Sequence, residues 1–275
     1  MMQVQEMLPI FGQTVNTVAT SDESQLISRS FSVARHVIFD FDGVIADSEE
    51  FQLRIWEELL REHALSLEGL SITVIAGISD HLAIERICSG LTAAVYDGLV
   101  AEKKRRCSER AWQIRPVPGI HELLRSVHGS MRLHICSSSS LSAIRDFLQR
   151  VLPHFLFDSI VSREDYSRRK PDPEPYLTLL SRAQVLSTEA VVIEDSFTGV
   201  QAAQAAGIPV IHLDRYGQNL TNVPSVTSLQ TLATCRNRPS HAVRLTASFS
   251  RITPIQRRVS FAKLLIEQGH VTTVR

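Results

Sequence analysis

The stretch His36–Glu49, H-V-I-F-D-F-D-G-V-I-A-D-S-E, decides the fold. Its apolar run, Val37–Phe39, ends abruptly at Asp40, and a second carboxylate, Asp42, follows two residues later. Short apolar runs closed by polar residues are typical of buried strands in parallel sheets. A D-x-D pair can also be a solvated acidic turn. Because ligands of open α/β sheets bind beyond the carboxyl ends of the strands, the two carboxylates are expected where a ligand would lie.

The composition of the chain narrows the class of protein. Its 275 residues are 44% hydrophobic and 21% charged, which is ordinary for a globular protein with a substantial core. The formal net charge is zero, so neither nucleic acid nor an anionic membrane is expected as a partner. No apolar run approaches the roughly 18 residues of a membrane span. The four cysteines are far apart, which favours a reducing, cytoplasmic setting over disulfides or a zinc site.

A helical segment is expected after the first strand. Apolar residues at helical spacing predict one buried helix face just after Ser48, and further helices are predicted over Asp80–Cys88 and Thr92–Gln113. Residues 50–114 therefore predict an all-helical unit inserted between two strands, and the run Arg115–Gly119, R-P-V-P-G, ends it. The residues of the first helix face are Phe51, Ile55, Trp56, Leu59 and Leu60.

Beyond residue 119 the chain alternates between helices and strands. Such alternation is typical of a doubly wound parallel sheet, so the predicted fold class is α/β, with the core in residues 35–49 and 115–235. Predicted strands cover Arg132–Cys136, Phe157–Val161, Ala190–Ile193 and Ile208–Leu213, and predicted helices cover Ile120–Val127, Leu141–Val151, Pro173–Ala183 and Phe197–Ala206.

The two ends of the chain differ from this pattern. Residues 1–34 are weakly patterned and lack the basic start of a secretory signal, so a mobile leader is expected. Residues 236–275 contain seven arginines, one lysine and a single acid, Glu267. This basic tail is either an arm for an anionic partner or a poorly ordered extension, and the second interpretation is favoured.

Polar residues follow three further segments of the predicted sheet. Ser137 comes directly after one strand, Glu194 and Asp195 end another, and Lys170 lies in the loop between them. Each residue has an ordinary alternative, because a serine or an acid favours a helix N-terminus and a lysine can belong to a solvated basic run. Since parallel strands end at the same edge of a sheet, we expect these side chains to converge with the carboxylates of the first strand.

The polar residues lie in four motifs: F-D-F-D-G-V from Phe39, I-C-S-S-S from Ile135, R-K-P-D-P from Arg169 and V-I-E-D-S-F-T-G-V from Val192. In this order and spacing, the motifs resemble those of the haloacid dehalogenase-like superfamily, in its capped phosphatase and β-phosphoglucomutase-like subfamily. The resemblance covers about residues 35–215. It implies a Rossmann-like core with a small helical cap inserted after the first motif, and a Mg²⁺-dependent phosphatase acting on a small phosphorylated metabolite.

The resemblance also implies roles for the acids. Asp40 would be the nucleophile and form an aspartyl-phosphate, and Asp42 would be the general acid to the leaving alcohol and then the general base to water. Mg²⁺ would be held by Asp40, the backbone carbonyl of Asp42 and Asp195, with Glu194 acting through water.

Three residues are implied in binding the phosphoryl group. Lys170 would pair with the phosphoryl oxygens and with Asp40. The hydroxyl of Ser137 and the backbone amide of Ser138 would bind another phosphoryl oxygen.

The activity is predicted from the positions at which this chain differs from dehalogenases and sugar phosphomutases of the same superfamily. Dehalogenases of this fold lack an acid two residues after the nucleophile, so Asp42 favours phosphoryl chemistry. The resembling sugar phosphomutases carry an arginine where this chain has Asp80 and a histidine where it has Gln52, which favours a phosphatase over a mutase. A catalytically silent binding module is a third hypothesis, and the intact polar positions count against it.

Substrate choice is expected to depend on the predicted cap. Its candidate specificity residues are Gln52, Ser79, Asp80 and His81, whose alternative is the plain surface of cap helices. Candidate substrates include phosphoglycolate, hexose phosphates and glycerol phosphates.

Overall fold

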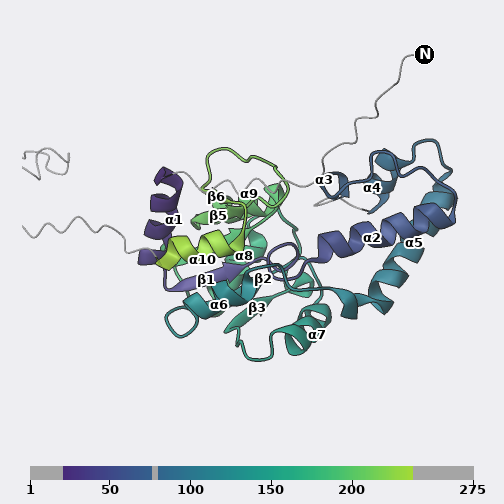
Figure 1. Cartoon of the computed structure of the whole chain (residues 1–275). Helices are drawn as coiled ribbons and strands as arrows, with labels where there is room; N and C mark the ends of the chain where they lie inside the picture. The colour runs from purple at the N-terminus through teal and green to yellow at the C-terminus, as the bar shows by residue number, and fades with distance from the viewer. Residues whose placement is uncertain (1–20, 76–79, 238–275) are drawn as a thin grey trace, which may run out of the picture. The chain divides into compact units, whose positions relative to one another are not determined.

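The structure, a computed structural model, describes residues 21–75 and 80–237. This part of the chain holds a six-stranded sheet of order β3-β2-β1-β4-β5-β6. Every neighbouring pair of strands is parallel, which confirms the predicted α/β class. The strands are β1 (His36–Phe39), β2 (Arg132–Cys136), β3 (Ser159–Val161), β4 (Ala190–Glu194), β5 (Val210–Leu213) and β6 (Ser225–Val226) (Figure 1).

The centre of the sheet is the pair β1 and β4, where the strand order changes direction. Phe39 of β1 pairs in register with Ile135 of β2 and with Ile193 of β4. These three strands therefore end almost level, and the residues that follow them emerge at one edge. A change of strand order is where open α/β sheets leave a crevice for a ligand.

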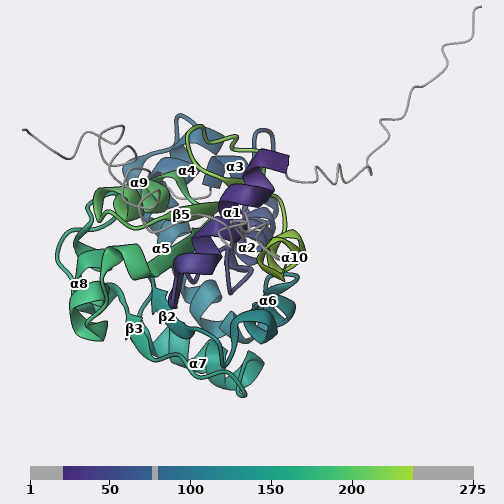
Figure 2. The same cartoon turned by 90° about the vertical axis from the view of Figure 1, so that its left-hand side faces the viewer.

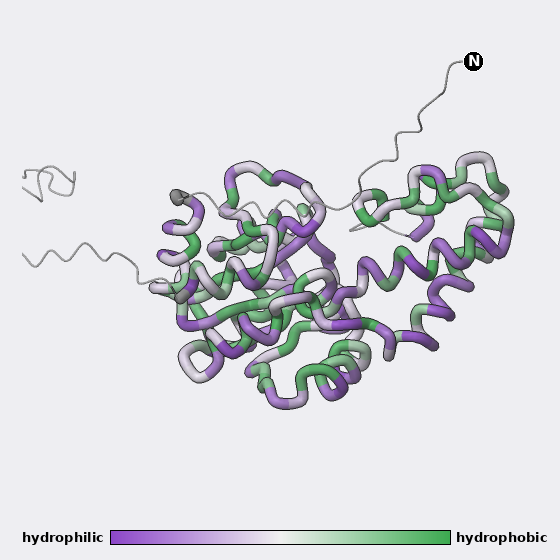
Figure 3. The backbone as a smooth tube through the Cα atoms, in the orientation of Figure 1, coloured by the Kyte–Doolittle hydropathy of each residue, from purple (hydrophilic) through white to green (hydrophobic). Residues whose placement is uncertain are grey.

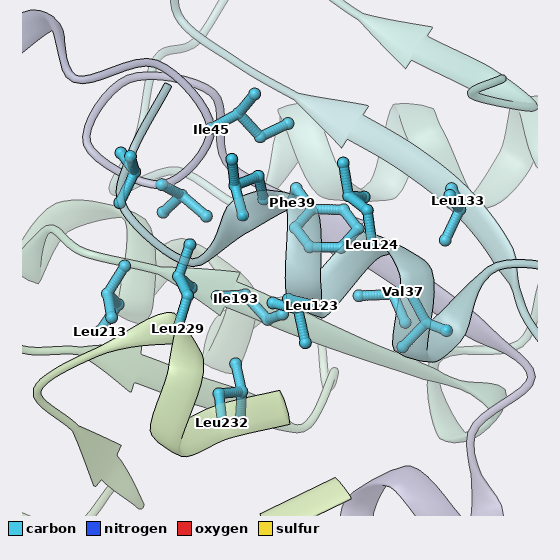
Figure 4. Packing of buried hydrophobic residues seen from close by; sticks show 14 of the residues in the cluster. Val37, Phe39, Ile45, Leu123, Leu124, Leu133, Ile193, Leu213, Leu229 and Leu232 are labelled. Carbon is cyan, nitrogen blue, oxygen red and sulfur yellow. The ribbon is translucent and has the colours of Figure 1, made fainter. Parts of the chain in front are cut away.

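Helices cover both faces of the sheet. They are α1 (Ser21–Val33), α6 (Ile120–Val127), α7 (Leu141–Val151), α8 (Glu174–Ala183), α9 (Phe197–Ala205) and α10 (Leu229–Asn237), with short 3-10 turns at Arg163–Asp165 and Ser187–Glu189. One face packs on α1, α6, α7 and α10 around Phe39 and Leu124 (Figure 4). The other packs on α8 and α9 around Tyr176 and Val192 (Figure 2). Because both faces are buried, the strands are nearly continuous apolar runs.

The segment between β1 and α6 is helical, as the apolar spacing predicted. It consists of α2 (Ser48–Glu62), α3 (Ile72–Ile75), α4 (Asp80–Ile87), α5 (Ala93–Glu109) and the 3-10 turn η1 (Ala111–Gln113). We call it the helical insert. It has a hydrophobic cluster of its own, in which Trp56, Leu59 and Ile84 are almost fully buried. Hydrophilic and hydrophobic residues alternate along α2 (Figure 3), and the buried residues recur at helical spacing, so one side of this helix packs in the cluster and the other carries polar residues.

The prediction of a leader over residues 1–34 was wrong for its last part. Ser21–Val33 form α1, and this helix packs against α10. Ile27 and Phe31 are buried in the same hydrophobic cluster as the sheet. The apolar residues of α1 are few, so the burial of this helix depends on α10, which lies some 200 residues further along the chain.

Several predicted boundaries also shift. The helix predicted over Thr92–Gln113 divides into α5 and η1, and Arg150 of α7 donates hydrogen bonds to the carbonyls of Ala111 and Trp112, at 3.2 and 3.0 Å. The strands predicted from Phe157 and Ile208 begin two residues later in the structure.

Some predictions fall outside the described residues. They concern residues 1–20, Ser79 and all of the basic tail beyond Asn237. Among the residues that the structure describes, no helix combines the length and the apolar character that crossing a membrane requires.

Candidate active site

Asp40 occupies the central position of the site, immediately after β1. Its backbone amide donates to the carbonyl of Ile193, at 2.9 Å, which continues the pairing of β1 with β4 by one residue. Its side chain is buried, with 7% of the residue exposed. The strand pairing therefore places one carboxylate at the switch point of the sheet, as the sequence predicted.

Lys170 brings a cation to this carboxylate. Its Nζ donates to Oδ1 of Asp40 at 2.6 Å, to Oε1 of Glu194 at 2.7 Å and to the carbonyl of Cys136 at 3.1 Å. Burial alone would lower the pKa of Lys170, but the carboxylates of Asp40 and Glu194 raise it well above its usual value. The ammonium group therefore stays charged, 5.0 Å from the ring centre of Tyr176.

Three buried acids gather beside this lysine. Asp40, Glu194 and Asp195 each offer a carboxylate oxygen, and these oxygens all lie within 4.8 Å of one another. Burial raises the pKa of Asp40 to about 8 against the opposing effect of Lys170, and burial together with the neighbouring acids raises that of Asp195 well above its usual value. Three buried acids with one lysine have a deficit of positive charge, and carboxylate oxygens are the ligands that Mg²⁺ prefers. The donor set fits Mg²⁺.

Two glycines allow these acids to approach the backbone. Gly43 has a φ of +79°, and a Cβ atom there would overlap the carboxylate of Asp195. A Cβ atom at Gly199 would overlap the carboxylate of Glu194 in the same way. Gly43 of the D-G motif is therefore required both by its positive φ and by close contact, whereas Gly199 of the T-G-V motif is required by close contact.

Glu194 differs from the other two acids in its partners. Its Oε1 accepts from Lys170, and its Oε2 accepts from the backbone amide and the hydroxyl of Ser196, at 2.8 and 3.0 Å. Since both of its oxygens are engaged by donors, Glu194 holds Lys170 and the loop after β4 in place.

Asp42 has hydrogen-bond partners outside the group of three acids. Its Oδ1 accepts from the hydroxyl of Ser48 at 2.8 Å, and its Oδ2 accepts from the hydroxyl of Ser139 at 2.6 Å. Neither serine was predicted from the sequence to have this role. Ser48 could have been suspected because it opens the helix that follows the D-x-D motif, whereas nothing in the run of four serines distinguishes Ser139.

The loop after β2 holds the predicted phosphate-binding serines. Ser137 is fully buried, and its hydroxyl accepts from the backbone amide of Ser139 at 2.9 Å. The hydroxyl of Ser138 accepts from that of Tyr166 at 3.3 Å. Both hydroxyls shape this loop, and their contact with a phosphoryl group stays a prediction. Cys136 is buried, and its burial raises the thiol pKa to about 12.

The predicted specificity residues separate into two groups. Gln52 and Asp80 both accept hydrogen bonds from Nζ of Lys103, a buried residue of α5 that the sequence analysis missed. His81 instead lies at the exposed surface, where its Nδ1 is 3.7 Å from Oδ1 of Asp97.

Two further residues near the site were also missed. Arg215, which follows β5, donates to the carbonyl of Gly43 at 3.3 Å and to Oδ1 of Asp47 at 2.9 Å, and so ties the start of α2 to the sheet. Burial, reinforced by the charge of Asp42, raises the pKa of Glu49 to about 7.

This geometry agrees with a comparison against protein families. Residues 37–213 match the haloacid dehalogenase-like hydrolase family, and the chain belongs to that family. The predicted family is confirmed, and with it the predicted class of enzyme, a hydrolase of this family.

The matches to individual relatives extend over most of the length of each relative. The chain is 26% identical over 178 residues to the fructose-1-phosphate phosphatase YqaB of Escherichia coli, covering 64% of this chain and 94% of the relative. It is 28% identical over 181 residues to the β-phosphoglucomutase of Bacillus subtilis, covering 62% of this chain and 80% of that relative. The crystal structure of CbbY from Rhodobacter sphaeroides with phosphate superposes with a TM-score of 0.58 at 20% identity, covering 72% of this chain and 95% of that one, which supports the fold alone.

Proposed function

We propose that this protein is a Mg²⁺-dependent phosphatase that hydrolyses a small phosphorylated metabolite, such as a sugar phosphate, through an aspartyl-phosphate on Asp40. The observation that carries the proposal is the cluster of Asp40, Glu194 and Asp195, whose oxygens lie within 4.8 Å of one another, together with the ion pairs of Lys170 to Asp40 and Glu194. Phosphate monoesters react slowly because their negative charge repels nucleophiles, so a site for them must combine carboxylate and cation. Names of the relatives support the substrate class.

The first step transfers the phosphoryl group to the protein. A carboxylate oxygen of Asp40 attacks phosphorus, the bond to the ester oxygen breaks, and Asp42 gives its proton to the leaving alkoxide. Lys170 neutralises charge on the nucleophile and on the phosphoryl oxygens, and loop residues 137–138 orient the group. A bound Mg²⁺, held by Asp40 and Asp195, would supply further positive charge at the phosphoryl oxygens.

The second step releases the phosphate. Asp42, now deprotonated, takes a proton from water, and the water oxygen attacks phosphorus. The bond from phosphorus to Asp40 breaks, which restores its carboxylate and liberates inorganic phosphate. The hydroxyls of Ser48 and Ser139 hold Asp42 in both steps, since either protonation state of a carboxyl group can accept from them.

The helical insert is proposed to act as a cap that covers the site and excludes water. The β-phosphoglucomutase similarity keeps a phosphomutase as the alternative. We favour hydrolysis because Gln52 and Asp80 stand where the mutases carry a histidine and an arginine. The expected setting is the cytoplasm, which suits free cysteines such as Cys88 and Cys136.

The test is phosphate release from a panel of phosphorylated metabolites, with and without Mg²⁺. Asp40→Asn should abolish release from every substrate, whereas Asp146→Asn, on an exposed acid of α7, should leave it intact. Activity that survives Asp40→Asn would refute the nucleophile. Transfer of labelled phosphate between positions of one sugar, with none reaching water, would establish the mutase instead.

A further inference from the structure

The helical insert contains a buried lysine. Lys103 of α5 is only 4% exposed, and its Nζ donates to Oε1 of Gln52 at 2.5 Å and to Oδ1 of Asp80 at 2.6 Å. The same ammonium lies 5.9 Å from the ring centre of Trp56. A charged lysine is almost never buried unless it is paired, so Asp80 is the counter-ion that keeps it there. We call Gln52, Asp80 and Lys103 the insert triad.

The insert triad is linked to the catalytic edge of the sheet through α2. The hydroxyl of Ser48, at the start of this helix, contacts Asp42. Gln52 comes four residues later and therefore lies one turn further along the same helix face, where the Cβ atoms of such a pair are about 5–6 Å apart. The charges of Asp42 and Lys103 both act on the carboxyl group of Glu49, which lies on the intervening turn. Ser48, which contacts Asp42, and Gln52, which contacts Lys103, therefore lie on successive turns of one helix face, which brings the triad near the proposed general acid.

The charge balance of the triad limits what it can bind. The positive charge of Lys103 is already compensated by Asp80, and Gln52 is neutral. A leaving group with a second phosphate or a carboxylate would lie beside the negative charge of Asp80, and the triad has no uncompensated cation to offset the repulsion. A hydroxyl group, in contrast, can donate to Asp80 and accept from the third N–H of the ammonium, since the contacts among the described residues use two of its three donors.

We propose that the insert triad selects phosphate esters whose leaving group is an uncharged polyol and discriminates against those with a second anionic group. Glycerol phosphate and hexose monophosphates belong to the first class, and phosphoglycolate and hexose bisphosphates belong to the second. This inference rests on the proposed phosphatase activity and specifies its substrate class. Asp80 is the residue that decides the selectivity, because it removes the free positive charge that a second anion would need.

The experiment compares kcat/KM for glycerol phosphate, a hexose monophosphate, phosphoglycolate and a hexose bisphosphate. The wild-type protein should prefer the best uncharged polyol ester over both doubly anionic esters by about tenfold or more. Asp80→Asn, which keeps the shape and frees the charge of Lys103, should reduce this ratio by about tenfold, through a lower KM for the doubly anionic esters.

Two control variants separate this role from a structural one. Asp80→Glu keeps the charge and should retain the preference. Glu85→Gln removes an exposed acid of the same helix and should leave the ratio unchanged. A wild-type protein that hydrolyses phosphoglycolate or the bisphosphate as well as the polyol esters overturns the inference, and so does an unchanged ratio in Asp80→Asn. In both cases hydrolysis itself survives, whereas a protein that releases phosphate from no ester overturns the proposed function as well.

Discussion

The hydroxyl of Ser139 donates a hydrogen bond of 2.6 Å to Oδ2 of Asp42, although 97 positions separate the two residues. Together with Ser48, it engages both oxygens of the Asp42 carboxyl group. A general acid must be within hydrogen-bond reach of the oxygen that it protonates, so a residue that fixes its rotamer should affect the chemical step more than substrate binding.

Removal of the Ser139 hydroxyl therefore tests the proposed acid. Ser139→Ala should lower kcat by about tenfold or more and change KM little, since the lost interaction orients a group that acts in the transition state. Steady-state phosphate release measures both parameters. Ser181→Ala, on the exposed side of α8, provides the control. An unaltered kcat in Ser139→Ala would show that Asp42 does not depend on this bond.

Removal of the cation at the site should affect stability as well as activity. In Lys170→Met, Asp40 and Glu194 lose their shared partner, and breaking such a buried pair typically costs about 3–5 kcal/mol. We expect a loss of this size in the free energy of unfolding, measured by urea denaturation without Mg²⁺, and no detectable phosphate release. Arg169→Met, at the exposed neighbouring position, should cost less than about 0.5 kcal/mol. Equal stability of the two variants would contradict the pairing.

The acidic cluster should make the stability of the protein depend on Mg²⁺. A ligand that binds the folded state alone stabilises it by about 2.7 kcal/mol at a concentration of 100 times its Kd. The melting temperature of the wild-type protein should therefore rise on Mg²⁺ addition, and that of Asp195→Asn should rise much less, because one of the three clustered carboxylates is lost. Equal shifts in the two proteins would place the ion elsewhere.

The effect of the close contact between Gly43 and Asp195 can be distinguished from the effect of backbone strain by comparing substitutions at two glycines. Gly43→Ala both forces a residue with a side chain to a φ of +79° and places Cβ in the carboxylate of Asp195. Gly129 has a φ of +77°, but nothing lies within 4 Å of a Cβ atom there. Each substitution should cost about 1 kcal/mol of strain in the free energy of unfolding. Gly43→Ala alone should abolish Mg²⁺-dependent phosphate release, and retained activity would mean that Asp195 is not needed in this position.

The stability of the protein should also depend on pH through His134. Burial, reinforced by the neighbouring His36, lowers the pKa of His134 to about 4, and Nδ1 of His36 lies 3.0 Å from its Nε2. Because the unfolded chain takes up this proton near pH 6.5 and the folded one does not, stability is lost as the pH falls from about 6.5 towards 4. The wild-type protein should lose about 2 kcal/mol more than His134→Gln between pH 7 and pH 5 in urea denaturation. Parallel losses would contradict a neutral buried imidazole.

The sequence by itself determined the fold class and the acids of the site. Apolar runs closed by polar residues identify the parallel strands, and parallel strands that end together bring Asp40 and Asp195 to one edge. Their positions could be predicted because each acid directly follows a short apolar run, which is a local property of the chain, and because parallel strands end at the same edge of a sheet.

Only the tertiary structure decided which partners hold these groups. The bonds from Ser139 to Asp42 and from Lys103 to Gln52 join residues 97 and 51 positions apart, and the burial of α1 depends on its packing against α10. Such contacts depend on how rotamers and helices from distant segments fit together, and neither periodicity nor spacing in the sequence contains that information.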